Sequence, residues 1–153
     1  MFLALFSSGG SQGSAEILGE WTCEARFTRT AEVVTHQLDV VYSPGGQGQY
    51  SGTLGVGLGM HFSKDERARS GFNQFNVSGE ITHHIEKGKL CTKYTISRLT
   101  GRDERAIELE DSIKRHSDVY LNTRKTCQDY KLEEGKLIVE GAGGQTVCVR
   151  PKR

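Results

Sequence analysis

The chain has 153 residues, and its 20 basic and 19 acidic residues leave a net charge of +1. This balance gives no electrostatic reason to expect a nucleic acid or an anionic membrane as a partner. The length suits one domain with a sizeable core, and no apolar run approaches the roughly 18 residues that a membrane-spanning helix needs.

The first residues, MFLALF followed by SSGGSQGS, are apolar and then small and polar. Gly13-Ser14-Ala15 resembles the small-residue end of a signal peptide, although the apolar run is short and no charged start precedes it. Two interpretations stay open, a flexible leader and an export signal shortened by a misplaced start codon. We expect residues 1–15 to be this leader and residues 16–153 to form a single β-rich domain.

Apolar and polar residues alternate with period two along most of the chain, which is typical of half-buried strands. The clearest segment is 50–62, where Leu54, Val56 and Leu58 share one face; a helix would scatter them around its axis. The alternation predicts five strands before residue 100, near 21–28, 34–42, 50–62, 75–85 and 90–96. The charged segment 63–74 between two of them is expected to be a mobile loop.

The alternation is lost in residues 101–117. The apolar residues that recur there at helical spacing are Ala106, Leu109 and Ile113. This spacing predicts one amphipathic helix near residues 103–116, and Thr100 with Asp103 offers it a capping-box-like start. Three further strands are predicted near 119–131, 136–140 and 145–150.

The four cysteines are Cys23, Cys91, Cys127 and Cys148. None belongs to a CxxC pair, which disfavours zinc-finger and thioredoxin chemistry. An even number of widely spaced cysteines on predicted strands favours two disulfides in an oxidising compartment, so the protein is expected to be periplasmic or secreted. The alternative is four reduced, buried thiols in a cytosolic protein.

The first and last strands each carry a special residue two positions from a cysteine, Trp21 beside Cys23 and Arg150 beside Cys148. In antiparallel pairing the sum of facing residue numbers is constant, so opposing the two cysteines also opposes Trp21 and Arg150. Opposed residues bring their Cβ atoms within about 4.5–5.5 Å, near enough for a disulfide, and indole and guanidinium can stack. We therefore predict a Cys23–Cys148 disulfide, with chance coincidence as the competing explanation.

Pairing the first and last strands closes the meander into a barrel and removes both exposed edges. By elimination, the second disulfide joins Cys91 and Cys127. The predicted fold class is all-β, an up-and-down antiparallel meander barrel of about eight strands with one amphipathic helix across a mouth or flank.

Gly19 and Trp21 on the first strand, with Arg150 on the last, form a pattern that resembles the calycins, as in lipocalins. The stretches GEWTC at 19–23 and CVR at 148–150 more closely resemble small bacterial lipocalin-like proteins. The resemblance implies a lipocalin-like barrel, and for these bacterial proteins it implies no established activity. The predicted helix departs from the lipocalin order, in which the helix follows the barrel.

The sequence holds no GxSxG elbow, P-loop, GxGxxG or HExxH motif, so it predicts no catalytic residue, no cofactor and no metal site. His83 and His84 point to opposite faces of one strand and cannot easily share a metal ion. His36 and His83 are instead expected in the core or a cavity. The alternate glycines of residues 55–59 leave a bare sheet face that the helix or a neighbouring molecule could approach closely.

The leading hypothesis is a non-enzymatic binding protein whose barrel carries a small apolar ligand. The predicted lining residues of its cavity are Tyr42, Leu54, Val56, Leu58, Phe75 and Tyr94. The alternative is an exported protein-binding module, an inhibitor or envelope component, that acts through loops or the Gly-rich sheet face; an enzyme is the least favoured class. A carrier predicts a cavity of about 300 Å³ or more, whereas a protein binder predicts a filled interior with an exposed apolar patch or an accessible sheet edge.

Overall fold

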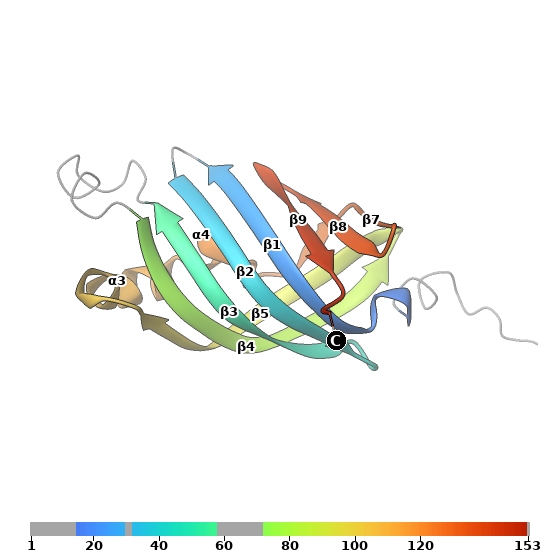
Figure 1. Ribbon diagram of the computed structural model, residues 1–153, viewed down its shortest axis with the longest axis horizontal. Coiled ribbons are helices and arrows are strands. Elements are labelled where there is room, and N and C mark those ends of the chain that lie inside the picture. Colours follow the sequence, from blue (N-terminus) through green and yellow to red (C-terminus); the bar gives the residue numbers. More distant parts are fainter. Residues whose placement is uncertain (1–14, 30–31, 58–71, 153) are drawn as a thin grey trace, which may run out of the picture.

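The computed structural model describes residues 15–29, 32–57 and 72–152. The strands formed by these residues are β1 (Gly19–Arg29), β2 (Glu32–Ser43), β3 (Gln47–Gly57), β4 (Phe72–Glu86), β5 (Lys89–Gly101), β6 (Thr126–Gln128), β7 (Tyr130–Glu133), β8 (Lys136–Gly141) and β9 (Gly144–Val149). The helices α3 (Glu104–Arg115) and α4 (Ser117–Tyr120) lie between β5 and β6. The strands form one antiparallel sheet that curls into a nearly closed barrel, which confirms the predicted all-β up-and-down fold (Figure 1).

The first and last strands, β1 and β9, lie side by side in opposite directions, with Cys23 opposite Cys148 (Figure 1). The strand order nevertheless starts at β6 and ends at β7, so the expectation that this pairing removes both edges is wrong. The two edge strands follow each other in sequence with only Asp129 between them. The Asp129 carbonyl accepts a hydrogen bond from the Glu140 amide of β8 (2.9 Å), which holds β6 near β8 at the seam of the barrel.

The strand predicted near 119–131 is wrong, because this segment contains the end of α4, an irregular stretch and the two short strands β6 and β7. Tyr120 and Leu121 are adjacent and both almost fully buried, which breaks the alternation that a half-buried strand shows. The Leu121 amide donates to the Ser117 carbonyl (2.8 Å), as the end of a helical turn does.

The helix predicted near 103–116 is present as α3, but the expectation that Thr100 begins its cap is wrong. Thr100 belongs to β5, where it pairs with Asn76. Asp103 is the N-cap residue, and its carboxylate accepts a hydrogen bond from the Ala106 amide (2.8 Å), satisfying a donor that the helix itself leaves free. No helix among the described residues is long and apolar enough to cross a membrane.

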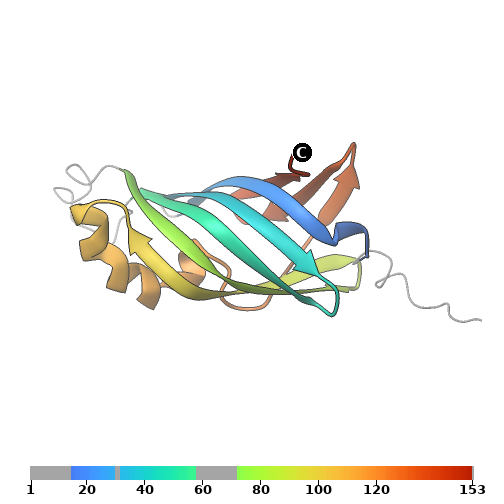
Figure 2. The same cartoon turned by 60° about the horizontal axis from the view of Figure 1, so that its bottom comes forward.

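The helix α3 lies at the end of the barrel where β5 finishes (Figure 2). Its residues that join the hydrophobic core are Ala106, Leu109 and Ile113. Gly101 permits this close approach, because a Cβ atom there would collide with the backbone of the first turn of α3. The bare face expected at the glycines of residues 55–59 is one that the helix or a neighbouring molecule could approach. At Gly55 and Gly57 the ring of Phe72 lies there instead of the helix, and Gly59 lies outside the described residues.

Candidate functional site

A contact between Arg150 and Trp21 links the end of the last strand to the first strand. The guanidinium carbon of Arg150 lies 3.7 Å from the centroid of the Trp21 ring, and its two terminal nitrogens donate to the carbonyls of Glu20 (3.0 Å) and Glu16 (3.2 Å). Gly19 has a φ of +102°, and a Cβ atom there would lie 3.0 Å from the guanidinium. These contacts tie the last strand to the chain segment that enters the first, so we assign them to the scaffold.

Two disulfides, Cys23–Cys148 and Cys91–Cys127, pair residues that face each other across neighbouring strands. Cys23 and Cys148 are almost fully buried and line the barrel interior. Cys91 lies between Leu90 and Thr92, whose side chains line that interior, so its own side chain points to the outer face. The first bridge links β1 to β9 and the second links β5 to β6.

The barrel interior is largely filled by the residues that the sequence assigned to a ligand cavity. Leu54, Val56 and Phe75 are almost completely buried in the core, together with Tyr42, and the ring of Tyr94 packs against it. The sixth predicted lining residue, Leu58, lies outside the described residues. The cavity that the described residues enclose inside the barrel, lined by Leu38, Tyr42 and Tyr94 among others, has a volume of about 40 Å³. Ligand pockets measure about 300–1,000 Å³, so this one suits no more than about one water molecule.

The two histidines expected in the interior hold backbone segments together. The Nε2 atom of His83 lies 2.9 Å from the carbonyl oxygens of both Ser43 and Gln47, which flank the β2–β3 turn. The Nε2 atom of His36 lies 2.7 Å from the carbonyl of Tyr120 and so links β2 to α4. A ring nitrogen that faces a carbonyl must carry the proton and donate, which leaves neither atom free to bind a metal.

One edge of β5 is covered by a strand only at its start. The strand β6 pairs with residues 90–92 of β5. Farther along, the Tyr94 amide donates to the Asn122 carbonyl (2.8 Å), and the Gly101 amide donates to a carboxylate oxygen of Glu110 in α3 (2.7 Å). Between Tyr94 and Gly101, no described strand pairs with this edge.

Ile96 and Leu99 direct their backbone groups to this open edge. In an antiparallel pair, the N–H and C=O of one residue point to the same side, and successive residues alternate between the two sides. The backbone N–H groups of Tyr94 and Gly101 both point away from β4, since they donate to Asn122 and Glu110. A bulge between these two residues shifts the pairing of β5 with β4 by one residue. Counting inward from either end therefore places Ile96 and Leu99 on the open side.

A groove of about 700 Å³ runs along this edge, and we call it the β5 edge groove. It is lined by residues 93–99 of β5 together with Lys114, Ser117 and Thr123. Lys93, Arg98 and Lys114 are exposed cations, no acidic residue lines the groove, and none of the ion pairs between described residues involves these three cations. The groove is therefore electropositive. Its aliphatic surface comes mainly from the half-buried Ile96, because Leu99 is almost fully buried.

The bulge that shapes the groove is fixed by Gly79 and Tyr50. The Tyr50 hydroxyl donates to the Thr95 carbonyl (3.0 Å), and its ring packs edge-on against Tyr94 with centroids 5.0 Å apart. A Cβ atom on Gly79 would collide with the Thr95 carbonyl, so only glycine lets β4 and β5 approach here. Burial, with a smaller effect of neighbouring Tyr94, raises the pKa of Tyr50 well above its usual range, so the hydroxyl keeps its proton.

The sequence patterns did not point to the β5 edge groove, because the strand predicted near 119–131 would have covered the edge of β5. The signal that could have revealed it is the adjacent apolar pair Tyr120-Leu121, which breaks the alternation. No protein-family model matches this chain, and no curated protein is similar enough to count as a relative.

Proposed function

We propose that this protein binds an extended, acidic segment of a partner protein, which adds as a strand to the open edge of β5. The observation that carries the proposal is that the outward-facing backbone groups of Ile96 lie in a groove lined by cations, where no described strand pairs with β5. Strand addition to an exposed sheet edge is a recurring mode of peptide recognition, in which main-chain hydrogen bonds supply affinity and side-chain contacts supply specificity.

The two kinds of contact have different roles in this proposal. Pairing with Ile96 aligns the bound segment along β5 and buries part of the aliphatic surface of that half-buried side chain. Acidic side chains of the segment meet Lys93, Arg98 and Lys114. Each exposed ion pair contributes only about 0.2–1 kcal/mol, so the cations mainly speed association and select acidic segments over basic ones.

The ligand-carrier hypothesis has less support than strand addition. A carrier needs a cavity of about 300 Å³ or more, whereas the cavity enclosed by Tyr42, Tyr94 and their described neighbours measures about 40 Å³. A filled interior with an accessible sheet edge is the combination expected of a protein-binding module. The open edge of β5 replaces the loops and the Gly-rich face as the proposed contact surface.

Export and kinship with small bacterial lipocalin-like proteins form part of the same proposal. The two disulfides support a periplasmic or extracellular location, because disulfides persist in oxidising compartments. The nearly closed up-and-down barrel, with Arg150 stacked on Trp21, is compatible with a lipocalin-like fold.

The test is isothermal titration calorimetry with a hexapeptide of alternating Glu and Val, acetylated and amidated at its ends. We expect saturable binding that weakens as salt is added, because salt screens exposed charges. Methylating alternate backbone nitrogens of the peptide should abolish binding, since strand pairing needs those donors. A peptide with Lys in place of Glu is the charge control and should not bind.

Protein variants separate the role of the groove from general attraction to a charged protein. Arg98→Gln with Lys114→Gln should weaken binding of the Glu–Val peptide about two- to thirtyfold, the sum of two exposed ion pairs. The matched pair Lys131→Gln with Lys136→Gln changes two exposed lysines on β7 and β8 and should leave the affinity unchanged. Equal binding of the Glu and Lys peptides, or full binding of the methylated peptide, would contradict strand addition.

A further inference from the structure

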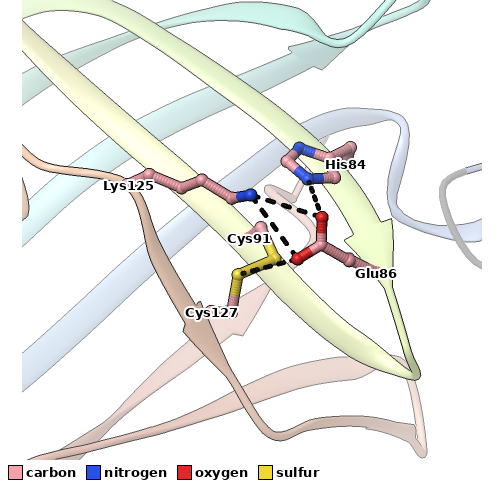
Figure 3. A network of polar contacts seen from close by, with 5 residues as sticks. All are labelled: His84, Glu86, Cys91, Lys125 and Cys127. Atoms are coloured by element: carbon pink, nitrogen blue, oxygen red, sulfur yellow. Dashed lines mark hydrogen bonds and ion pairs between the residues drawn. A yellow bond between two sulfur atoms is a disulfide. The ribbon is translucent and has the colours of Figure 1, made fainter.

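Four side chains that commonly ligate metals converge on the outer face of β4, β5 and β6 (Figure 3). His84 faces Cys91 across β4 and β5, and Cys91 faces Cys127 across β5 and β6. The ligand atoms of His84, Glu86 and Cys91 lie within 4.8 Å of one another, and the Cys127 sulfur lies 3.9 Å from a carboxylate oxygen of Glu86. One nitrogen, one carboxylate and two sulfurs therefore share a small volume.

The two sulfurs are bonded to each other in the structure, so neither is available as a metal ligand. Glu86 instead accepts hydrogen bonds from the Lys125 ammonium at 3.3 and 3.5 Å and lies 3.5 Å from His84 Nε2. The hydrogen bond from Lys125, followed by its charge, lowers the pKa of the Glu86 carboxyl. The carboxylate is thus ionised and held beside the disulfide at neutral pH.

We propose that reduction of the Cys91–Cys127 disulfide converts this cluster into a zinc site with His84, Glu86, Cys91 and Cys127 as ligands. The reductant is a dithiol, which becomes a disulfide while its two electrons and two protons turn the bridge into two thiols. Zn²⁺ then displaces both thiol protons and binds two thiolates, one imidazole nitrogen and one carboxylate oxygen. This number and type of ligands is typical of a tetrahedral zinc site.

The surroundings of the cluster favour this conversion. Two thiolates and a carboxylate carry three negative charges, one more than Zn²⁺ neutralises. The positive charge of the Lys125 ammonium, which lies beside Glu86, offsets the remaining negative charge without binding the metal itself. Cys91 is fully buried but its partner Cys127 is only half-buried, whereas both cysteines of the other bridge, Cys23 and Cys148, are almost fully buried inside the barrel. A dithiol therefore reaches the Cys91–Cys127 bridge first, by attack at the Cys127 sulfur.

The experiment compares the full chain in its oxidised form with the chain reduced by a phosphine and desalted without oxygen. Each is titrated with Zn²⁺ against a chromophoric chelator, and with Co²⁺, whose charge-transfer absorption reports thiolate ligation. We expect one zinc ion bound per reduced chain and none per oxidised chain at the same concentrations. The absorption should appear only in the reduced protein.

Single substitutions then identify the ligands without removing a cysteine. His84→Ala and Glu86→Gln should each weaken zinc binding at least about tenfold, since even outer-shell changes cost 10–100-fold. Glu80→Gln changes an exposed carboxylate on the same face of β4 and should bind zinc as the wild type does. The proposal is overturned if reduction adds no zinc binding, or if His84→Ala and Glu86→Gln bind zinc as tightly as the wild type.

Discussion

Replacing Cys23 and Cys148 together by alanine is expected to lower the free energy of unfolding by about 5 kcal/mol, because the bridge restricts the unfolded chain. It closes a segment with a sequence separation of 125 residues, and the loop-entropy treatment gives this magnitude for a loop of that size at about 25 °C. The matched double change, Cys91→Ala with Cys127→Ala, opens a separation of 36 residues and should cost about 4 kcal/mol. The larger loss belongs to the bridge that joins the first and last strands.

The assay is equilibrium urea unfolding of the oxidised wild type and the two double variants, with linear extrapolation to water. Truncation acts in the same direction, since the first variant shortens two buried side chains, Cys23 and Cys148, whereas the second shortens one, Cys91, beside the half-buried Cys127. A smaller loss on removing Cys23–Cys148 than on removing Cys91–Cys127 would refute the reasoning that pairing of the chain ends restricts most of the unfolded chain.

Three further outcomes are expected. Gly79→Ala should destabilise the protein by about 1–3 kcal/mol in urea unfolding, the usual cost of overpacking, because the added methyl group meets the Thr95 carbonyl; wild-type stability would speak against this contact. Lys125→Met should raise the pKa of Glu86 toward its ordinary value in a carboxyl NMR titration. That depressed pKa stabilises the fold above the pKa of the unfolded chain, and the contribution is lost as pH falls through the folded value, so the variant should lose this acid dependence. Burial raises the pKa of Tyr94 from 10.0 to about 12, so the protonated hydroxyl contributes to the stability of the fold below pH 10, and this contribution is lost as pH rises toward 12. Tyr94→Phe should therefore reduce the fall of the urea midpoint between pH 10 and 12. An unchanged fall in the variant would contradict this assignment.

The long strands were predictable from the sequence because each pairs with its neighbour along the chain and buries one face. Trp21, Cys23 and Phe27 point inward in β1, as their spacing indicates. The pairing of β1 with β9 followed from two coincident spacings, and the structure has the register that opposes Cys23 and Cys148. The alternation within each strand, together with the constant sum of facing residue numbers between antiparallel strands, therefore predicts most of the barrel.

The interior and the open edge could not be predicted in the same way. Alternation shows that Leu54, Val56 and Phe75 point inward, but whether they meet or leave a cavity depends on the curvature of the sheet. The open edge depends on where β6 stops pairing with β5, and that is decided by the burial of Tyr120 and Leu121 against the core. Both features arise from contacts between segments far apart in the sequence.

Hydrogen exchange of single backbone amides, followed by NMR, tests most directly whether β5 offers an open edge for strand addition. In the free protein the Thr95 amide, which faces β4, should exchange slowly, whereas the Ile96 amide should exchange rapidly. Saturation with the hexapeptide of alternating Glu and Val should slow exchange at Ile96 at least about tenfold, the effect of roughly 1.4 kcal/mol of added protection. Slow exchange at Ile96 before the peptide is added, or no change after it binds, would contradict the open edge and the strand that is proposed to occupy it.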